Sequence, residues 1–153
     1  MKKIGVIVSL CIHIAYAVAS AAMFFGLRES LENGGMAETV PEGIGAVGLI
    51  VVALLGALFV GVLLLLGISL AAVLFEICDL AFDKRGFSFA YGLISFGFLL
   101  FFGGTLVDTL MAALADGRMG ALWQSGETYY HIGLTLSALI PTLVGARRTF
   151  QKR

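Results

Sequence analysis

The sequence predicts an all-α integral membrane protein, a four-helix bundle with both termini in the cytoplasm. Of its 153 residues, 59% are hydrophobic and 13% are charged, whereas a soluble domain usually carries about 25% charged residues. Four apolar stretches are long enough to cross the hydrocarbon core, which takes about 20 residues of helix. Basic residues are concentrated in alternate connecting segments. We therefore expect residues 1–153 to form a single transmembrane domain.

The first apolar stretch imitates a secretory signal peptide. It begins after Lys2 and Lys3, and residues 17–19 (Ala-Val-Ala) would suit a cleavage site. The apolar run continues through Phe25, beyond a typical signal sequence, which favours a retained helix. The predicted spans cover about residues 4–27, 44–68 with an extension to 82, 87–114 and 129–146.

The second apolar run, from Gly43 to Phe82, is about twice as long as one span requires. As a single helix it would measure about 60 Å, against a hydrocarbon core of about 30 Å. Either a tilted helix projects into the cytoplasm, or the helix breaks near Gly67 and residues 68–82 lie along the membrane surface. The sequence thus predicts an elongated hairpin between the second and third helices, directed toward the cytoplasm.

The distribution of basic residues predicts the orientation. With four spans and the N-terminus inside, the inner segments hold eight basic residues and the outer loops hold two. The inner set is Lys2, Lys3, Lys84, Arg85, Arg147, Arg148, Lys152 and Arg153, and the outer set is Arg28 and Arg118. This positive-inside bias predicts cytoplasmic termini in a bacterial cytoplasmic membrane. A five-span model would place Lys84 and Arg85 outside and is disfavoured.

The two outer loops carry turn and interface signals. Asn33-Gly34-Gly35 breaks the first loop, and Pro41 marks the entry to the second helix. Trp123, Tyr129 and Tyr130 flank the second loop, where aromatic residues are enriched at membrane interfaces.

Four ionisable residues lie inside the predicted spans: His13, Glu76, Asp79 and Asp108. Because burying such groups is costly, they are candidates for ion, proton or partner binding. His13 suggests a haem ligand or proton relay, or a neutral imidazole bonded to a neighbouring carbonyl or hydroxyl. A haem shared with His131 is disfavoured, because the two residues are expected at different depths. No cofactor is predicted.

Glu76, Asp79 and Asp83 are spaced i, i+3 and i+7, so they share one helix face. This acidic stripe, opposite Leu74, Ile77, Cys78 and Phe82, suggests a cation-binding or docking patch. The simpler interpretation is a solvated face at the end of a protruding helix, paired with Lys84 or Arg85.

Asp108 lies about two turns inside the outer end of the third helix. We expect it to pair with Arg118 or His131 at the interface rather than to form an ion or proton site.

Catalytic motifs are absent from the sequence, which has no GxSxG, HExxH, Walker loop or CxxC. Cys11 and Cys78 are expected to be reduced residues packed among the helices. The zero net charge gives no support for nucleic-acid binding. Ala53, Ala57 and Gly61 repeat at i, i+4 and i+8, which favours close packing of helices within the bundle or between subunits.

The length, four spans, inside termini and long central hairpin resemble, in layout, the small membrane subunit of tripartite substrate-binding-protein-dependent transporters. We accordingly predict a non-enzymatic subunit or accessory component of a membrane transport complex. Its partners would be the lipid bilayer and either another membrane protein or a second copy.

Two alternatives remain open. One is a small homo-oligomeric transporter or channel that uses Glu76 or Asp108. The other is a membrane enzyme acting on lipid or quinone, which would require His13, Glu76 and Cys11 to meet at one depth.

Overall fold

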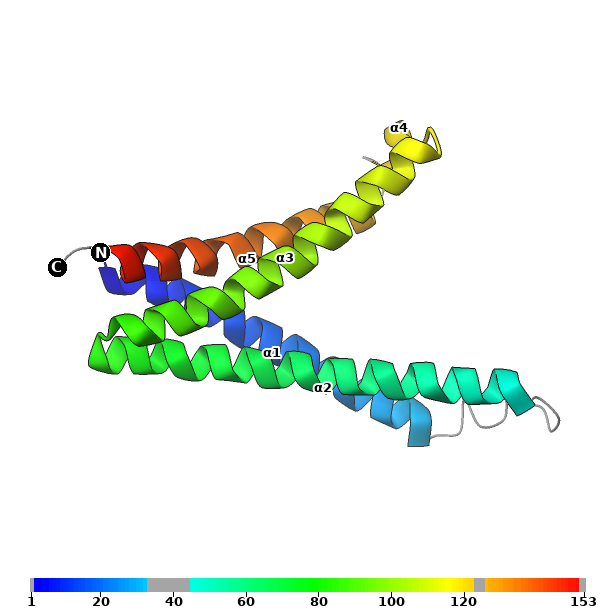
Figure 1. Ribbon diagram of the computed structural model, residues 1–153, viewed down its shortest axis with the longest axis horizontal. Helices are drawn as coiled ribbons and strands as arrows, with labels where there is room; N and C mark the ends of the chain where they lie inside the picture. The colour runs from blue at the N-terminus through cyan, green and yellow to red at the C-terminus, as the bar shows by residue number, and fades with distance from the viewer. Residues whose placement is uncertain (1, 33–44, 123–125, 152–153) are drawn as a thin grey trace. The chain divides into compact units, whose positions relative to one another are not determined.

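The computed structural model describes residues 2–32, 45–122 and 126–151, and these residues form helices connected by short turns (Figure 1). The helices are α1 (Lys2–Glu32), α2 (Gly45–Phe82), α3 (Arg85–Ala115), α4 (Met119–Leu122) and α5 (Gly126–Phe150). All but the single turn α4 contain a stretch long and apolar enough to cross a membrane. The all-α prediction with four candidate spans is therefore confirmed, and the orientation stays a prediction.

Several sequence signals lie outside the described residues. They are Asn33-Gly34-Gly35, Pro41, Trp123, Lys152 and Arg153.

The second helix is continuous. α2 runs from Gly45 to Phe82 through Gly67, so the alternative with a break near Gly67 is not observed. The turn that follows is only two residues long, because Asp83 adopts a left-handed conformation with φ of 49° and its N–H donates to the Asp79 carbonyl at 2.9 Å. Aspartate tolerates this conformation better than most residues. The start of α3 consequently lies directly beside the end of α2.

The described residues divide into two compact units. One contains Met1–His13 together with Ala71–Arg153, and the other contains Ile14–Leu70. In the second unit α1 meets α2 at Phe24 and Phe59, whose ring centroids are 4.7 Å apart. All the residues of the candidate site belong to the first unit.

Each long helix of the first unit buries a stripe of mostly small and polar residues spaced three or four positions apart. The stripes are Val6, Ser9 and His13 on α1; Ala72, Glu76 and Asp79 on α2; Ser88, Tyr91, Ser95 and Phe98 on α3; and Ala138, Pro141 and Gly145 on α5. Large apolar side chains face outward instead, as Leu74, Ile77 and Phe82 do on α2. This arrangement is the one expected of helices packed in lipid.

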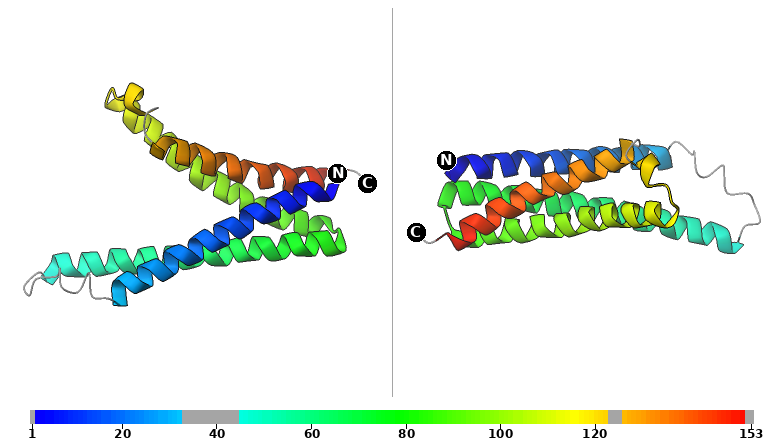
Figure 2. Two further views of the ribbon diagram at one scale, coloured as in Figure 1. Left: turned by 180° about the vertical axis from the view of Figure 1, so that it is seen from behind. Right: turned by 90° about the horizontal axis from the view of Figure 1, so that it is seen from above.

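α3 packs along α5, as the two views of Figure 2 show, and the closest approach is between two glycines. A Cβ built on Gly145 would lie 2.6 Å from the Gly92 Cα, so the two backbones touch. The small-residue stripe predicted on α2 makes no such close contact among the described residues. Ala53 and Ala57 are exposed, and a Cβ on Gly61 would meet no atom within 4 Å. An interface between subunits stays a prediction for that stripe.

Candidate functional site: a buried polar core

Eight polar side chains from four helices converge in the first unit, and we call this group the polar core. Its members are Ser9 and His13 of α1, Glu76 and Asp79 of α2, Ser88, Tyr91 and Ser95 of α3, and Arg148 of α5. Seven of them are fully buried, and only Arg148 retains some exposure, 13% of its side chain. The core places several ionisable groups inside segments that are apolar enough to span a membrane.

The centre of the polar core is a contact between histidine and glutamate. Nδ1 of His13 lies 2.9 Å from Oε1 of Glu76, and the Ser9 hydroxyl donates to the same carboxyl oxygen. On the other side of the ring, Nε2 of His13 lies 3.2 Å from Oγ of Ser95. Both ring nitrogens therefore contact polar partners, one on α2 and one on α3.

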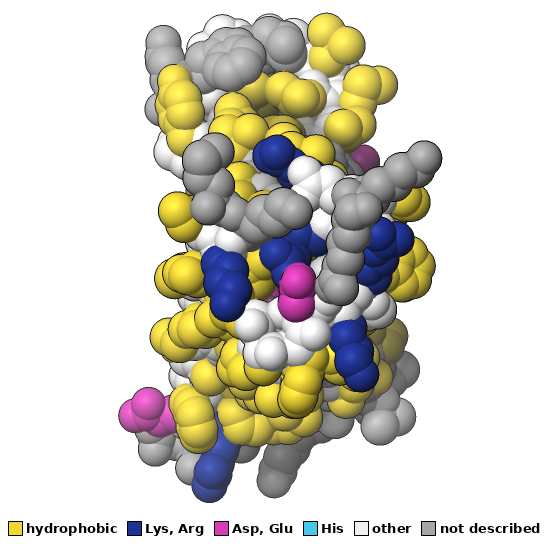
Figure 3. Space-filling model, turned by 90° about the vertical axis from the view of Figure 1, so that its left-hand side faces the viewer, with side chains coloured by type: hydrophobic (Ala, Val, Ile, Leu, Met, Phe, Trp, Pro, Cys, Tyr) yellow, Lys and Arg dark blue, Asp and Glu magenta, His cyan; other side chains and the backbone are white. Residues whose placement is uncertain are grey.

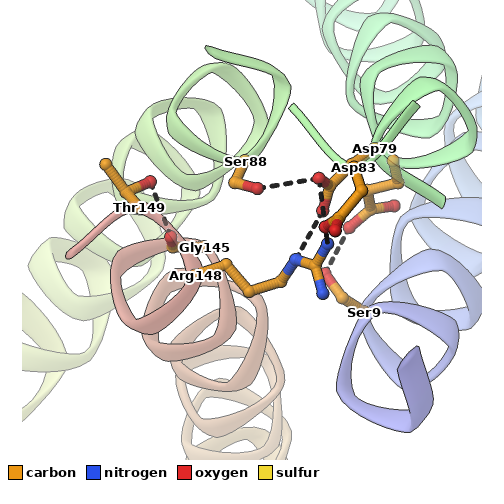
Figure 4. A network of polar contacts seen from close by, with 8 residues as sticks. Ser9, Asp79, Asp83, Ser88, Gly145, Arg148 and Thr149 are labelled. Carbon is orange, nitrogen blue, oxygen red and sulfur yellow. Dashed lines mark hydrogen bonds and ion pairs between the residues drawn. The ribbon is translucent and has the colours of Figure 1, made fainter. Parts of the chain in front are cut away.

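The second part of the polar core is a paired arginine (Figure 4). Arg148 approaches Asp79 with two nitrogens, Nε at 2.7 Å from Oδ2 and Nη2 at 3.1 Å from Oδ1. Nη2 also donates to Asp83 at 2.7 Å, and the Ser88 hydroxyl donates to Asp79 at 2.9 Å. The contact between Nη2 and Oδ1 is a hydrogen bond, and the contact between Nε and Oδ2 is an ion pair by distance. Hydrogen bonds between two charged groups are stronger than neutral ones.

These contacts correct the interpretation of the acidic stripe. Glu76 and Asp79 are 0% and 1% exposed, so the solvated-face interpretation is wrong. The expected pairing with Lys84 or Arg85 is also wrong for Asp79, because Asp79 forms its ion pair with Arg148. Glu76 and Asp79 face inward because the facing helices supply a histidine, an arginine and hydroxyl groups, which offset the cost of burial.

The carboxyl at the centre of the core has one oxygen without a hydrogen-bond partner in the described part of the chain, and the buried Tyr91 hydroxyl is in the same state. Oε2 of Glu76 is buried and has no hydrogen-bond partner among the described residues. A buried carboxyl oxygen in this state is costly, and such groups are found where a site takes up a proton or a ligand.

The two sides of the polar core differ in their access to water. Toward the chain termini it reaches Asp83, whose side chain is 70% exposed. In the opposite direction the Phe98 ring lies 6.2 Å from the His13 ring and stacks on Phe102 at 5.9 Å. Within the first unit, the core thus reaches solvent at Asp83, its open end, and two aromatic rings lie beyond His13 in the opposite direction.

The open end is rich in basic residues (Figure 3). Lys3, Lys84, Arg85 and Arg147 are exposed there, where α1 begins, α2 turns into α3, and α5 ends. Nη2 of Arg85 donates to the Gln151 carbonyl at 3.1 Å and so joins two of these segments.

The remaining candidates lie outside the core. Asp108 is exposed, and Arg118 pairs with Asp116, so the expected pair between Asp108 and Arg118 is not formed. His131 lies in the first part of α5, 17 residues or about 25 Å from Arg148 along the helix, so it lies far from His13. Cys11 is exposed and does not join His13 and Glu76.

No three His, Cys, Asp or Glu side chains of the described segments are grouped as a metal site. Sequence reasoning missed five core residues, which are Ser9, Ser88, Tyr91, Ser95 and Arg148. The signal that could have found the three on α3 is their own i, i+3, i+7 spacing, which repeats the spacing of the acidic stripe. In the sequence, Arg148 stands out only as one of the inner basic residues.

Comparisons with protein-family models, with curated proteins and with solved structures find no match to this chain. The interpretation of the polar core therefore depends on its own geometry.

Proposed function

We propose that this chain is a small multi-pass protein of the bacterial cytoplasmic membrane that carries protons across it, with His13 and Glu76 as the proton-binding pair. The observation that carries the proposal is the buried contact between His13 Nδ1 and Glu76 Oε1. Ionisable residues that meet inside a helical bundle are typical of proton relays.

The hydrogen bonds around His13 support a proton between these two atoms. The Ser95 hydroxyl lies 2.6 Å from the Tyr91 carbonyl and 3.2 Å from His13 Nε2. Its single proton is assigned to the shorter contact, so Ser95 accepts from an N–H at Nε2. Nδ1 and Oε1 then need a proton between them, because two lone pairs at 2.9 Å would repel. The pair is either imidazolium with carboxylate or imidazole with carboxylic acid.

Charge balance supports the same assignment. Asp79 and Arg148 neutralise each other, and one shared proton makes the pair of His13 and Glu76 neutral as well. A fully buried net charge would be far more costly than this neutral arrangement. The second oxygen, Oε2 of Glu76, offers a place for the incoming or outgoing proton.

The access of the core to water favours a carrier over an open pore. Protons would enter or leave at the end marked by Asp83 and Arg148, while Phe98 and Phe102 close the other direction. The basic residues at the open end support its placement in the cytoplasm. Transport would require the aromatic closure to move, so we expect slow, carrier-like turnover.

The test is proton flux in vesicles loaded with a pH-sensitive dye, with a potassium gradient and valinomycin to set the membrane potential. The wild-type protein should acidify or alkalinise the lumen faster than protein-free vesicles do. Glu76→Gln and His13→Gln should each reduce the rate to that of protein-free vesicles, because each variant lacks one of the two groups that share the proton.

Asp108→Asn is the matched control, since it removes an exposed carboxylate from an apolar helix without touching the core. It should keep the wild-type rate. Flux that survives Glu76→Gln, or wild-type vesicles that behave like empty ones, would overturn the proposal.

The second candidate is a non-enzymatic subunit of a membrane transport complex, in which the polar core would only fix the packing of the helices. Its support is the exposed small-residue stripe at Ala53 and Ala57, which suits contact with a second chain. It predicts recovery as a stable assembly after mild solubilisation, and recovery only as a monomer would count against it.

A lipid- or quinone-modifying enzyme is less well supported. His13 and Glu76 do meet, as that alternative requires, but both are fully buried. A head group therefore has no exposed surface on the pair to approach.

A further inference from the structure

An apolar groove runs between α3 and α5 on the outside of the first unit. It has a volume of about 190 Å³ and is lined by Phe89, Gly92, Leu93 and Phe96 of α3 and by Thr142, Gly145, Ala146, Thr149 and Phe150 of α5. The two threonine hydroxyls donate to carbonyls of their own helix, at 2.8 Å each. The groove therefore offers an almost purely hydrocarbon surface.

The floor of the groove is the contact between Gly92 and Gly145. Because neither residue has a side chain, the helices touch there, and the larger side chains on both sides form the walls. A side chain on either glycine would fill the floor or push the helices apart.

A cation stands at one end of the groove. Arg85, Phe89, Gly92 and Phe96 are spaced i, i+4, i+7 and i+11, so they lie on one face of α3. The Arg85 side chain is exposed, and one of its five N–H groups donates to the Gln151 carbonyl. The others remain suited to an anionic oxygen, and arginine is well adapted to phosphate.

We propose that the groove binds one acyl chain of an anionic phospholipid whose phosphate pairs with Arg85. The volume is below the 300–1,000 Å³ typical of pockets that enclose a whole small molecule, so it suits part of a flexible chain. From Arg85 to Phe96 the helix rises about 16 Å, close to the thickness of one leaflet, about half of a 30 Å hydrocarbon core. The site thus has the length and charge pattern of a single lipid and is separate from the proton pair.

The experiment is native mass spectrometry of the purified full chain, titrated with phosphatidylglycerol or with phosphatidylcholine of identical acyl chains. Wild type should bind phosphatidylglycerol about fivefold more tightly, the preference expected from one arginine near the membrane surface. Arg85→Gln should abolish this preference. Ala146→Phe, which fills the groove but keeps the arginine, should weaken binding of both lipids.

Two control variants separate the site from general effects. Arg147→Gln removes an exposed charge at the same end of the bundle, from a residue that does not line the groove, and Leu143→Phe adds bulk to an exposed position of α5 outside it. Both should bind like wild type.

Equal binding of the two lipids by wild type would overturn the proposal. So would an equal loss in Arg85→Gln and Arg147→Gln, which would indicate general attraction to the basic end. Dissociation of a dimer by Ala146→Phe would assign the groove to a second copy instead.

Discussion

The two halves of α3 contain similar residues and use them differently. In the first half, Ser88 and Ser95 are buried and contact Asp79 and His13 on other helices. In the second half, Thr105 and Thr109 donate to carbonyls of their own helix at 2.8 Å each, and Asp108 is exposed.

The difference comes from the helices that each half meets. The first half faces polar stripes on α1 and α2 and the Arg148 side chain of α5. The second half lies beside the early part of α5, where Thr135 and Ser137 also bond their own backbone. A polar residue in an apolar helix therefore becomes part of a site only where a neighbouring helix presents a polar stripe at the same depth.

The largest effect that tests this comparison is expected from Arg148→Ala. Removing the arginine leaves the buried Asp79 carboxylate unpaired, which should lower the free energy of unfolding by about 3–5 kcal/mol. Unfolding in detergent, followed by circular dichroism, would measure the loss. Adding Asp79→Asn to this variant should restore part of the stability, because the orphaned charge is removed.

The matched control for that prediction is Arg118→Ala, at the opposite end of α3. Its pair with Asp116 is exposed on both sides, so the loss should be below about 1 kcal/mol. Equal losses in the two arginine variants would show that the buried pair contributes no more than a surface pair.

Two glycine-to-alanine substitutions on α5 are expected to have smaller effects on the free energy of unfolding, and the two effects should have opposite signs. Gly145→Ala places a methyl group 2.6 Å from the Gly92 Cα and should destabilise the protein by about 1–3 kcal/mol through overpacking. Gly133→Ala meets no atom within 4 Å and should stabilise the helix by up to about 1 kcal/mol. The same unfolding measurement distinguishes them, and stabilisation by Gly145→Ala would contradict the close contact of α3 with α5.

The sequence predicted four helices long and apolar enough to span a membrane, because hydropathy and length determine which segments can cross one. It also selected His13, Glu76 and Asp79, since ionisable residues in apolar helices are conspicuous. It did not predict that Glu76 and Asp79 face inward: an i, i+3, i+7 stripe defines a face, but not whether that face meets water or other helices.

The sequence did not identify the partners of the acidic stripe, for a similar reason. Serines such as Ser9 and Ser95 are common in membrane helices, and Arg148 resembles the other inner basic residues at the end of a span. Only the packing of four helices shows that these residues share a depth with Glu76. Asp108 looked equivalent in the sequence but is exposed.

The most direct test of the central claim is infrared difference spectroscopy of the protein in membranes, recorded across a pH change. The account predicts a carboxyl band that disappears in Glu76→Gln, shifts in His13→Gln and is unchanged in Asp108→Asn, because Glu76 exchanges a proton within the pair it forms with His13. A spectrum that is the same in wild type and Glu76→Gln would contradict it.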